Sequence, residues 1–157
     1  MFMDHTLDER TMKWDRKFLD ACDHFRQWSK DRSRQVAAVV VGENKRILSV
    51  GYNGFPRGCN DEVEERHERP EKYFWTEHAE RNAIYNAAAE GVSLKGATFY
   101  IKPLFPCVDC ARGIIQVGAA RLVTMKPDFD DPTYGESFRR SAEMMREAGL
   151  RISLVEN

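Results

Sequence analysis

Apolar residues recur at two different spacings along the chain, and these spacings predict alternating helices and strands. Over residues 15–30 the large apolar side chains lie three or four positions apart, as on one face of an amphipathic helix. Residues 36–41 form a continuous apolar run typical of a buried strand, and residues 47–50 form a second short strand. The turn-like residues 42–45 between them predict an antiparallel hairpin.

The second half of the chain continues this alternation after a long loop at residues 51–75 that shows no regular pattern. Loops of this length in a compact domain are usually functional, so we expect this one to shape a substrate pocket. Thr76 is a favourable N-cap for a helix that reaches residue 89 and ends at Gly91. Five more elements are predicted: a strand at 97–101, a helix at 107–117, a strand at 121–125, a helix at 134–148 and a strand at 151–155.

The order of these elements predicts an α/β fold. Helices of this length join parallel strands, so we expect the last three strands to be parallel and to lie between layers of helices. Together with the hairpin, they give a mixed five-stranded sheet in a three-layer α/β/α arrangement. A length of 157 residues and a hydrophobic fraction of 42% fit one domain over residues 1–157.

Charge and hydropathy narrow the classes of partner. The formal net charge is −1 and basic residues are interleaved with acidic ones, so the basic stripe of a nucleic-acid binder is missing. The longest aliphatic run, residues 36–41, is too short to span a bilayer, and the first ten residues do not resemble a secretory signal. We therefore expect a soluble cytoplasmic protein that acts on small polar molecules, without a nucleic-acid or membrane partner.

The four cysteines are too few for a disulfide-built scaffold, and two of them have the spacing of a metal site. Cys107 and Cys110 lie about one helical turn apart, so both thiolates can bind one ion. Cys22 shares a helical stripe with Phe18 and Phe25, which predicts that it is buried.

His78-x-Glu80 followed by Pro106-Cys107-x-x-Cys110 is the most informative pattern in the chain. One imidazole and two thiolates provide three zinc ligands and leave a fourth position for a water whose pKa the metal lowers to about 7. The pattern is the signature of zinc deaminases, in which the glutamate is a general acid and base and not a ligand. A lone Cys-x-x-Cys pair is also compatible with a redox motif or a structural clip, but those readings leave His78 and Glu80 unexplained.

Longer stretches resemble one family more specifically. Residues 51–59, Gly-Tyr-Asn-Gly-Phe-Pro-Arg-Gly-Cys, and residues 78–84, His-Ala-Glu-Arg-Asn-Ala-Ile, look like deoxycytidylate (dCMP) deaminases, as do residues 104–107 and 114–116. The match covers residues 14–125. It implies a cytidine-deaminase-like fold that hydrolyses dCMP to dUMP and ammonia, with zinc-bound hydroxide as nucleophile and Glu80 as proton shuttle. It also implies a homo-oligomer, with dCTP and dTTP as possible effectors.

The resemblance also implies substrate contacts. Asn53 would hydrogen-bond the sugar, Ala79 would offer backbone to the pyrimidine, and the Cys107 amide would help to orient the substrate, beside Phe105 and Pro106.

The phosphate contact is less specific in the sequence. Arg57 is the candidate, with Lys30 and Arg34 as rivals, because a guanidinium fork suits phosphate. Aromatic side chains that could stack on the base, although such residues are more often core, are Phe55, Trp75, Tyr100 and Phe105.

The chain also departs from the family in places. Arg81 replaces a residue that is usually smaller or uncharged, and residues 126–138 do not match the typical tail, which can close over substrate in this fold. Cys59 and His67 could bind a second metal, but no further ligand is evident. Two alternatives therefore stay open. One is a deaminase of a nucleoside, free base or modified cytosine nucleotide, and the other is a zinc-stabilised non-catalytic nucleotide-binding module.

Overall fold

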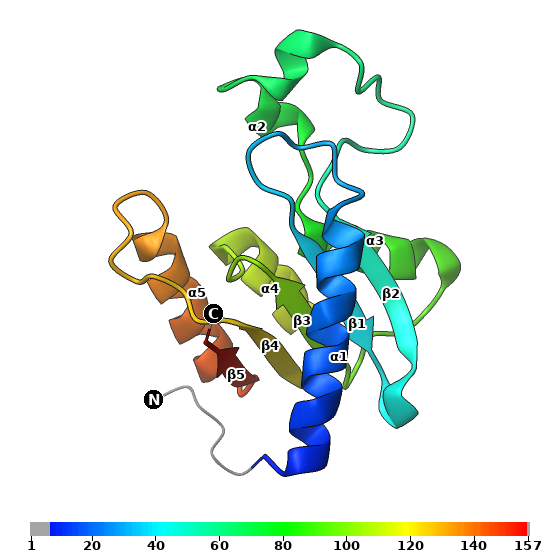
Figure 1. Ribbon diagram of the computed structural model, residues 1–157, viewed down its shortest axis with the longest axis vertical. Coiled ribbons are helices and arrows are strands. Elements are labelled where there is room, and N and C mark those ends of the chain that lie inside the picture. Colours follow the sequence, from blue (N-terminus) through cyan, green and yellow to red (C-terminus); the bar gives the residue numbers. More distant parts are fainter. Residues whose placement is uncertain (1–6, 157) are drawn as a thin grey trace.

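The sheet has the mixed topology that the element order predicts. The computed structural model describes residues 7–156, so residues 1–6 and 157 of the predicted domain lie outside the described residues. Its elements are α1 (Glu9–Arg26), β1 (Ala37–Val41), β2 (Ile47–Tyr52), α2 (Lys72–Trp75), α3 (Ala79–Glu90), β3 (Thr98–Lys102), α4 (Val108–Gln116), β4 (Arg121–Met125), α5 (Gly135–Glu147) and β5 (Arg151–Val155) (Figure 1). The strand order is β2-β1-β3-β4-β5. β1 is antiparallel to β2 and β3, whereas β3, β4 and β5 are parallel, which confirms the predicted hairpin and the parallel half.

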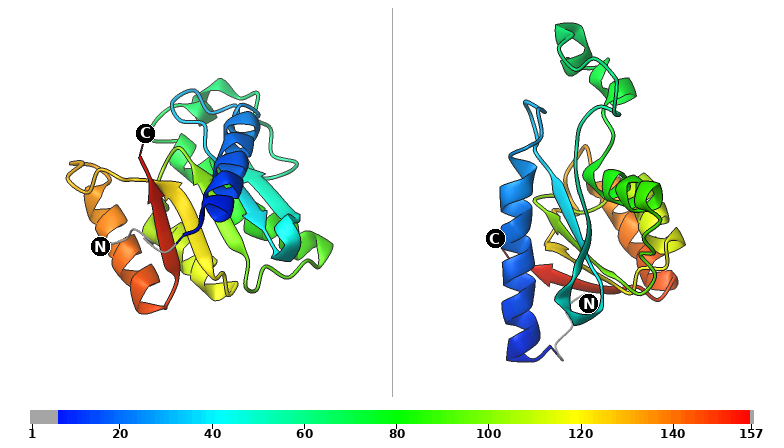
Figure 2. Two further views of the ribbon diagram at one scale, coloured as in Figure 1. Left: turned by 60° about the horizontal axis from the view of Figure 1, so that its bottom comes forward. Right: turned by 90° about the vertical axis from the view of Figure 1, so that its right-hand side faces the viewer.

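Helices cover both faces of the sheet, because the side chains of its buried strands alternate between two cores. Val39 of β1 packs on one face with Phe18 and Cys22 of α1, and Val40 points to the other face. Figure 2 shows α1 alone on one side and α3, α4 and α5 on the other. Cys22 is fully buried, as predicted from its helical stripe. No helix within residues 7–156 is long and apolar enough to cross a membrane.

Two helices begin at positions different from those predicted. α1 starts at Glu9 instead of residue 15, because Asp8 caps it by accepting a hydrogen bond from the Thr11 backbone N–H at 2.7 Å. α3 starts at Ala79 and not after Thr76. Gly54 and Glu77 form an isolated backbone bridge that keeps the chain extended through residue 77.

The loop predicted to be irregular contains two short helical segments, Glu64–His67 and α2. Residues 55–76, here called the lobe, stand away from one end of the sheet (Figures 1 and 2). Rings organise the interior of the lobe. Phe55 stacks on His67 with ring centroids 4.8 Å apart, and the Arg66 guanidinium lies 3.7 Å from the Trp75 ring centroid.

Candidate metal centre and active site

Three side chains with metal-binding atoms meet where two helices begin. His78 is the N-cap of α3, Cys107 is the N-cap of α4, and Cys110 lies in the first turn of α4. The His78 Nδ1 atom is 3.5 Å from the Cys107 Sγ atom and 3.4 Å from the Cys110 Sγ atom. Within residues 7–156, no other group of three His, Cys, Asp or Glu side chains converges in this way. The structure therefore brings the three predicted zinc ligands together.

These distances fit a tetrahedral zinc ion. Zn–N and Zn–S bonds of about 2.0 and 2.3 Å at tetrahedral angles separate nitrogen from sulfur by about 3.5 Å. The observed nitrogen–sulfur distances of 3.5 and 3.4 Å are close to this value. Both helix N-termini also direct the positive ends of their dipoles toward the site, which stabilises thiolates. The residues present thus fit zinc in both geometry and charge.

The two thiols differ in acidity. A hydrogen bond from Cys110 and a contact with His78 lower the pKa of Cys107 to about 4, despite its burial. The same bond to Cys107, together with burial, raises the pKa of Cys110. The two sulfur atoms lie within 4.8 Å of each other, so two thiolates here would repel. A bound cation would allow both thiols to ionise.

A glycine lets the ligand-bearing helix lie directly against the sheet. A Cβ atom on Gly51 of β2 would lie 2.2 Å from the Ala79 carbonyl oxygen and 2.3 Å from the Ala83 nitrogen. Both of these atoms belong to α3, whose first residue follows His78. Gly51 therefore sets how closely α3 approaches β2, and with it the position of His78.

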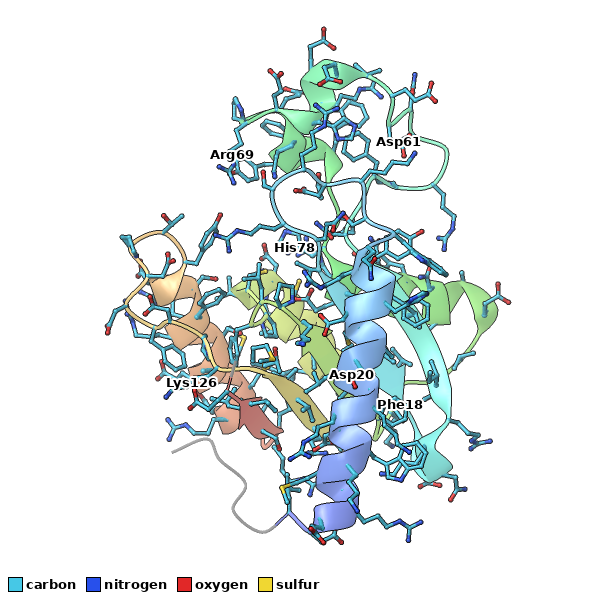
Figure 3. All side chains as sticks on the ribbon, in the orientation of Figure 1. Phe18, Asp20, Asp61, Arg69, His78 and Lys126 are labelled. Atoms are coloured by element: carbon cyan, nitrogen blue, oxygen red, sulfur yellow. The ribbon has the colours of Figure 1, made fainter. Side chains whose placement is uncertain are left out.

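Glu80 is buried beside this centre. It lies in the first turn of α3 with only 5% of its surface exposed, and it forms no ion pair with a described residue. Burial raises the pKa of its carboxyl group. Glu80, His78 and Cys107 together line a cavity of about 280 Å³. Figure 3 places His78 at the end of the sheet, beneath the lobe that carries Arg69.

Most of the predicted substrate contacts lie in or beside this cavity. Asn53, Ala79 and Phe105 line it, whereas Pro106 is buried next to Phe105 without lining it. Asn53 also holds the chain before β1. Its Oδ1 atom accepts from the Val36 N–H at 2.9 Å, and its Nδ2 group donates to the Arg34 carbonyl at 2.7 Å.

Arg57, the predicted phosphate contact, lies elsewhere. It is exposed, donates to the Asn86 side chain, and lines a second hollow beside Tyr52 and Tyr85. Its direction follows from the path of the lobe, which local sequence does not specify. Of the two rivals, Arg34 lines the active-site cavity, whereas Lys30 does not line it and pairs with Asp61.

The predicted aromatic candidates also separate. Phe55 and Trp75 pack inside the lobe, and Tyr100 lies on the α1 face of the sheet, so Phe105 alone of the four lines the cavity. The Cys59 thiol and the His67 ring take part in no three-ligand cluster of the described residues.

Sequence reasoning missed several residues of the cavity wall. Tyr134 and Phe138 come from the divergent segment 126–138, Asp31 comes from the loop between α1 and β1, and Arg69 and Lys72 come from the lobe. The charge-rich composition of the lobe was a signal for Arg69 and Lys72, but it did not distinguish them from solvated surface residues.

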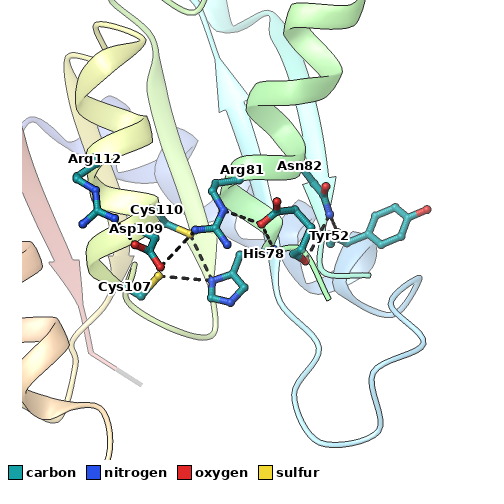
Figure 4. A network of polar contacts seen from close by, with 9 residues as sticks. Tyr52, His78, Arg81, Asn82, Cys107, Asp109, Cys110 and Arg112 are labelled. Carbon is teal, nitrogen blue, oxygen red and sulfur yellow. Dashed lines mark hydrogen bonds and ion pairs between the residues drawn. The ribbon is translucent and has the colours of Figure 1, made fainter. Parts of the chain in front are cut away.

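Arg81, noted above as a departure, links the two ligand-bearing helices. Its Nε atom is 2.6 Å from Glu77, and its Nη1 atom is 3.7 Å from the Asp109 carboxylate on α4. Figure 4 shows this network beside His78, Cys107 and Cys110. The Arg81–Asp109 pair joins α3 to α4 close to the metal ligands.

Comparisons with known proteins agree with the fold and the site. Residues 12–126 match the family model of the cytidine and deoxycytidylate deaminase zinc-binding region. The chain is 37% identical to the "uncharacterized deaminase in luxG 3' region" of Aliivibrio fischeri over 142 residues, covering 90% of this chain and 92% of that protein. It is 37% identical to human deoxycytidylate deaminase over 125 residues, covering 76% and 68%.

The fold also resembles that of a solved deaminase. The crystal structure of dCMP deaminase from cyanophage S-TIM5 in complex with dCMP and dUMP superposes with a TM-score of 0.73 at 22% identity, covering 95% of this chain and 99% of that one. The predicted family and its zinc cofactor are confirmed, since the family model describes a zinc-binding region and His78, Cys107 and Cys110 are positioned to bind the ion. This chain is a member of the cytidine and deoxycytidylate deaminase family.

Proposed function

We propose that this protein hydrolyses dCMP to dUMP and ammonia. The observation that carries the proposal is the composition of one cavity. The zinc ligands His78 and Cys107 and the buried Glu80 line it, and Arg34 and Arg69 line it as well. A deaminating centre and cationic groups for a phosphate thus share one site. The relatives support the nucleotide, because one is named deoxycytidylate deaminase and one solved structure contains dCMP and dUMP.

The chemistry requires water to replace the 4-amino group of cytosine. Zinc supplies the Lewis acidity that makes water nucleophilic at neutral pH. Glu80 takes the proton released as the water oxygen bonds to C4, and passes it to the ring nitrogen N3. Glu80 then takes the remaining proton from the new C4 hydroxyl and delivers it to the amine as the C4=O bond forms and the C4–N4 bond breaks, which releases ammonia. Because Glu80 is buried, it can exchange protons with substrate without competition from bulk water.

The basic residues of the cavity favour a nucleotide over a nucleoside or a free base. Arg34 and Arg69 form no ion pair with any residue of the described chain. Unpaired guanidinium groups at a cavity are suited to a phosphate dianion, which they can bind through two parallel hydrogen bonds each. Arg34 and Arg69 thus replace Arg57 as the proposed phosphate contacts.

The remaining wall suits the base and the sugar. Phe105 lies with its ring edge-on to Phe138, and Tyr134 stacks on Phe138, so three aromatic rings form one side of the cavity. We propose that Phe105 contacts the cytosine and that the Ala79 backbone reads its polar edge. Asn53 keeps one Nδ2 hydrogen and one Oδ1 lone pair for the deoxyribose hydroxyl.

Ammonia release by zinc-loaded protein tests the proposal. The substrates are dCMP, CMP, deoxycytidine and cytosine, and Glu80→Gln is the control. Turnover of dCMP with little turnover of deoxycytidine, absent in the variant, is expected. Turnover of only unphosphorylated compounds would keep the deaminase chemistry and refute the nucleotide. Full function in the Glu80 variant would instead favour a zinc-stabilised binding module.

We further propose a homo-oligomer that dCTP activates and dTTP inhibits, on the strength of the family resemblance. Sigmoidal dCMP kinetics that become hyperbolic with dCTP would support this control, and hyperbolic kinetics unaffected by either nucleotide would contradict it. Light scattering gives the oligomeric state. A cytoplasmic location is also proposed and is supported by the four free thiols, which suit a reducing compartment. Cell fractionation tests it.

A further inference from the structure

One carboxylate organises the cationic side of the cavity. Asp31 lies in the loop between α1 and β1 and lines the cavity, with its side chain only 9% exposed. Its Oδ1 atom accepts hydrogen bonds from the backbone N–H groups of Ser33 at 2.8 Å and Arg34 at 2.9 Å. Its Oδ2 atom lies 3.2 Å from the Lys72 Nζ atom, whose side chain is 11% exposed.

The first pair of contacts fixes the origin of the Arg34 side chain. A carboxylate that accepts two successive backbone N–H groups closes a tight turn, so the chain leaves the turn in one direction. The Arg34 guanidinium then lies over the Tyr134 ring, 4.8 Å from its centroid. Without the Asp31 carboxylate, the turn loses both of these hydrogen bonds, and the backbone position of Arg34 is no longer fixed.

The Lys72 contact joins the same turn to the lobe. Lys72 is the first residue of α2, and its backbone N–H donates to the Glu68 carbonyl at 2.8 Å, which closes the turn that contains Arg69. The ion pair with Asp31 therefore anchors the segment that places Arg69 at the cavity. Since both side chains of this pair are largely buried, it is less screened than a surface pair.

Asp31 cannot itself bind a phosphate, because two anions repel. Its surroundings keep it ionised, since the N–H groups of Arg34 and Ser33 and the Lys72 ammonium lower its pKa although burial opposes them. We propose that Asp31 is a positioning residue for the substrate phosphate. It holds Arg34 through its turn and Arg69 through Lys72 at the places a phosphate dianion requires. The inference rests on the proposed function and extends it to a residue that touches no substrate.

The test separates phosphate recognition from general stability. Asp31→Ala removes both the hydrogen bonds to the turn and the ion pair with Lys72. Asp31→Asn keeps an acceptor for the turn but loses the charge that faces Lys72. Lys72→Met removes the ion pair alone. The matched control is Asp61→Ala. Asp61 of the lobe also pairs with a lysine, Lys30 of the loop between α1 and β1, at 2.8 Å, but it does not line the cavity.

For each zinc-loaded variant, kcat and KM for dCMP are measured, together with the affinities for dUMP and deoxyuridine by calorimetry. Asp31→Ala is expected to raise KM for dCMP and to lower the affinity for dUMP by about tenfold or more. The kcat for dCMP and the affinity for deoxyuridine should stay within about twofold of the wild-type values. Asp31→Asn and Lys72→Met should show smaller losses of the same kind, and Asp61→Ala none. Thermal midpoints and zinc content show whether each variant is folded. If Asp31→Ala does not fold, Asp31→Asn and Lys72→Met test the proposal in its place.

Equal losses for dUMP and deoxyuridine, or a fall in kcat at unchanged KM, would overturn the positioning role. An Asp61→Ala effect as large as that of Asp31→Ala would do the same. Failure of the proposed function gives a different result, because the wild-type protein would then prefer deoxyuridine to dUMP or bind neither.

Discussion

Two buried polar clusters lie on opposite faces of the same sheet, and they differ in how fully their members are paired. On the α1 face, the closed cluster consists of Asp15, Tyr100, Arg121 and Ser153. Arg121 donates to both Asp15 oxygens at 2.9 and 2.6 Å and to the Ser153 hydroxyl at 3.0 Å, and the Tyr100 hydroxyl donates to Asp15 at 2.7 Å. On the other face, the open cluster consists of His78, Glu80, Cys107 and Cys110. Its Glu80 forms no ion pair with a described residue.

The contrast shows how one fold uses buried charge in two ways. In the closed cluster each ionised group meets its partner within the protein, so the cluster binds α1 to β3, β4 and β5 and has no capacity left for a ligand. In the open cluster the donor atoms converge on a shared point, and their charges are balanced only by something the chain does not supply. Loss of a member should therefore affect stability on one face and chemistry on the other.

Glu80→Gln should have the largest effect and should act on chemistry alone. The amide keeps the size of the side chain but cannot take a proton, so kcat for dCMP should fall roughly 100- to 10,000-fold. The thermal midpoint should stay the same or rise, because a buried carboxylate without an ion pair is removed. Ammonia release, a thermal scan and zinc analysis measure the three quantities. A loss of less than tenfold, with zinc retained, would remove Glu80 from its proposed role.

Arg121→Met should produce the opposite result. It leaves Asp15 buried without its cation, which costs about 3–5 kcal/mol of unfolding free energy. Turnover per folded, zinc-loaded molecule should stay within about twofold, since the cluster lies on the far face of the sheet from the cavity. Urea unfolding followed by tryptophan fluorescence measures the loss. The paired variant Asp15→Asn, Arg121→Met should recover part of it, and a large fall in kcat of the folded fraction would contradict the separation of roles.

The two clusters also differ in how far sequence could predict them. Cys107 and Cys110 share one helical turn, so their convergence follows from local geometry, and the motif supplies His78 and Glu80. The closed cluster joins Asp15 to Arg121 across 106 positions, and no local pattern connects them. The alternation of strand and helix patterns sufficed for the hairpin and for the parallel half of the sheet, because each strand or helix shows its own local pattern.

The errors have the same origin. Thr76 is a good cap by composition, but the Gly54–Glu77 bridge, a contact between distant residues, moves the helix start to Ala79. Arg57 lines the second hollow and not this cavity, because the direction of a long loop depends on its packing, here on rings such as Phe55 and His67. Residues that depend on the path of a loop, such as Arg69 and Lys72, were beyond local rules for the same reason.

Gly51→Ala tests the support beneath the open cluster, with a smaller expected effect. The added methyl group would overlap the Ala79 carbonyl and the Ala83 nitrogen, so α3 must shift, at a cost of about 1–3 kcal/mol in unfolding free energy. The shift should also weaken zinc binding, as measured by competition with a chromophoric chelator. Gly54→Ala is the matched control, because its Cβ would meet no atom within 4 Å. Equal effects in both variants would argue against the close approach as the cause.

The smallest expected effect concerns the acidity of buried groups on the α1 face of the sheet. Burial raises the pKa of Cys22 to about 12 from an ordinary value of 9.0, and its thiol donates to the Tyr100 carbonyl at 3.3 Å. The folded state therefore holds this proton more tightly than the unfolded state does, so the contribution of Cys22 to stability is present below about pH 9 and is lost as the pH rises toward 12.

Burial and the hydrogen bond to Asp15 raise the pKa of Tyr100 as well, which acts in the same direction. The urea concentration at the unfolding midpoint should thus decrease as the pH rises from 8 to 10.5. The decrease, taken relative to each protein's own midpoint at pH 8, should be smaller in Cys22→Ala. At pH 8, iodoacetamide should modify the partly exposed Cys59 of the zinc-loaded protein and leave Cys22 unmodified until the chain unfolds. Rapid labelling of Cys22 in the folded protein would mean that the α1 face opens easily, and the closed cluster could then not be the rigid side of the sheet.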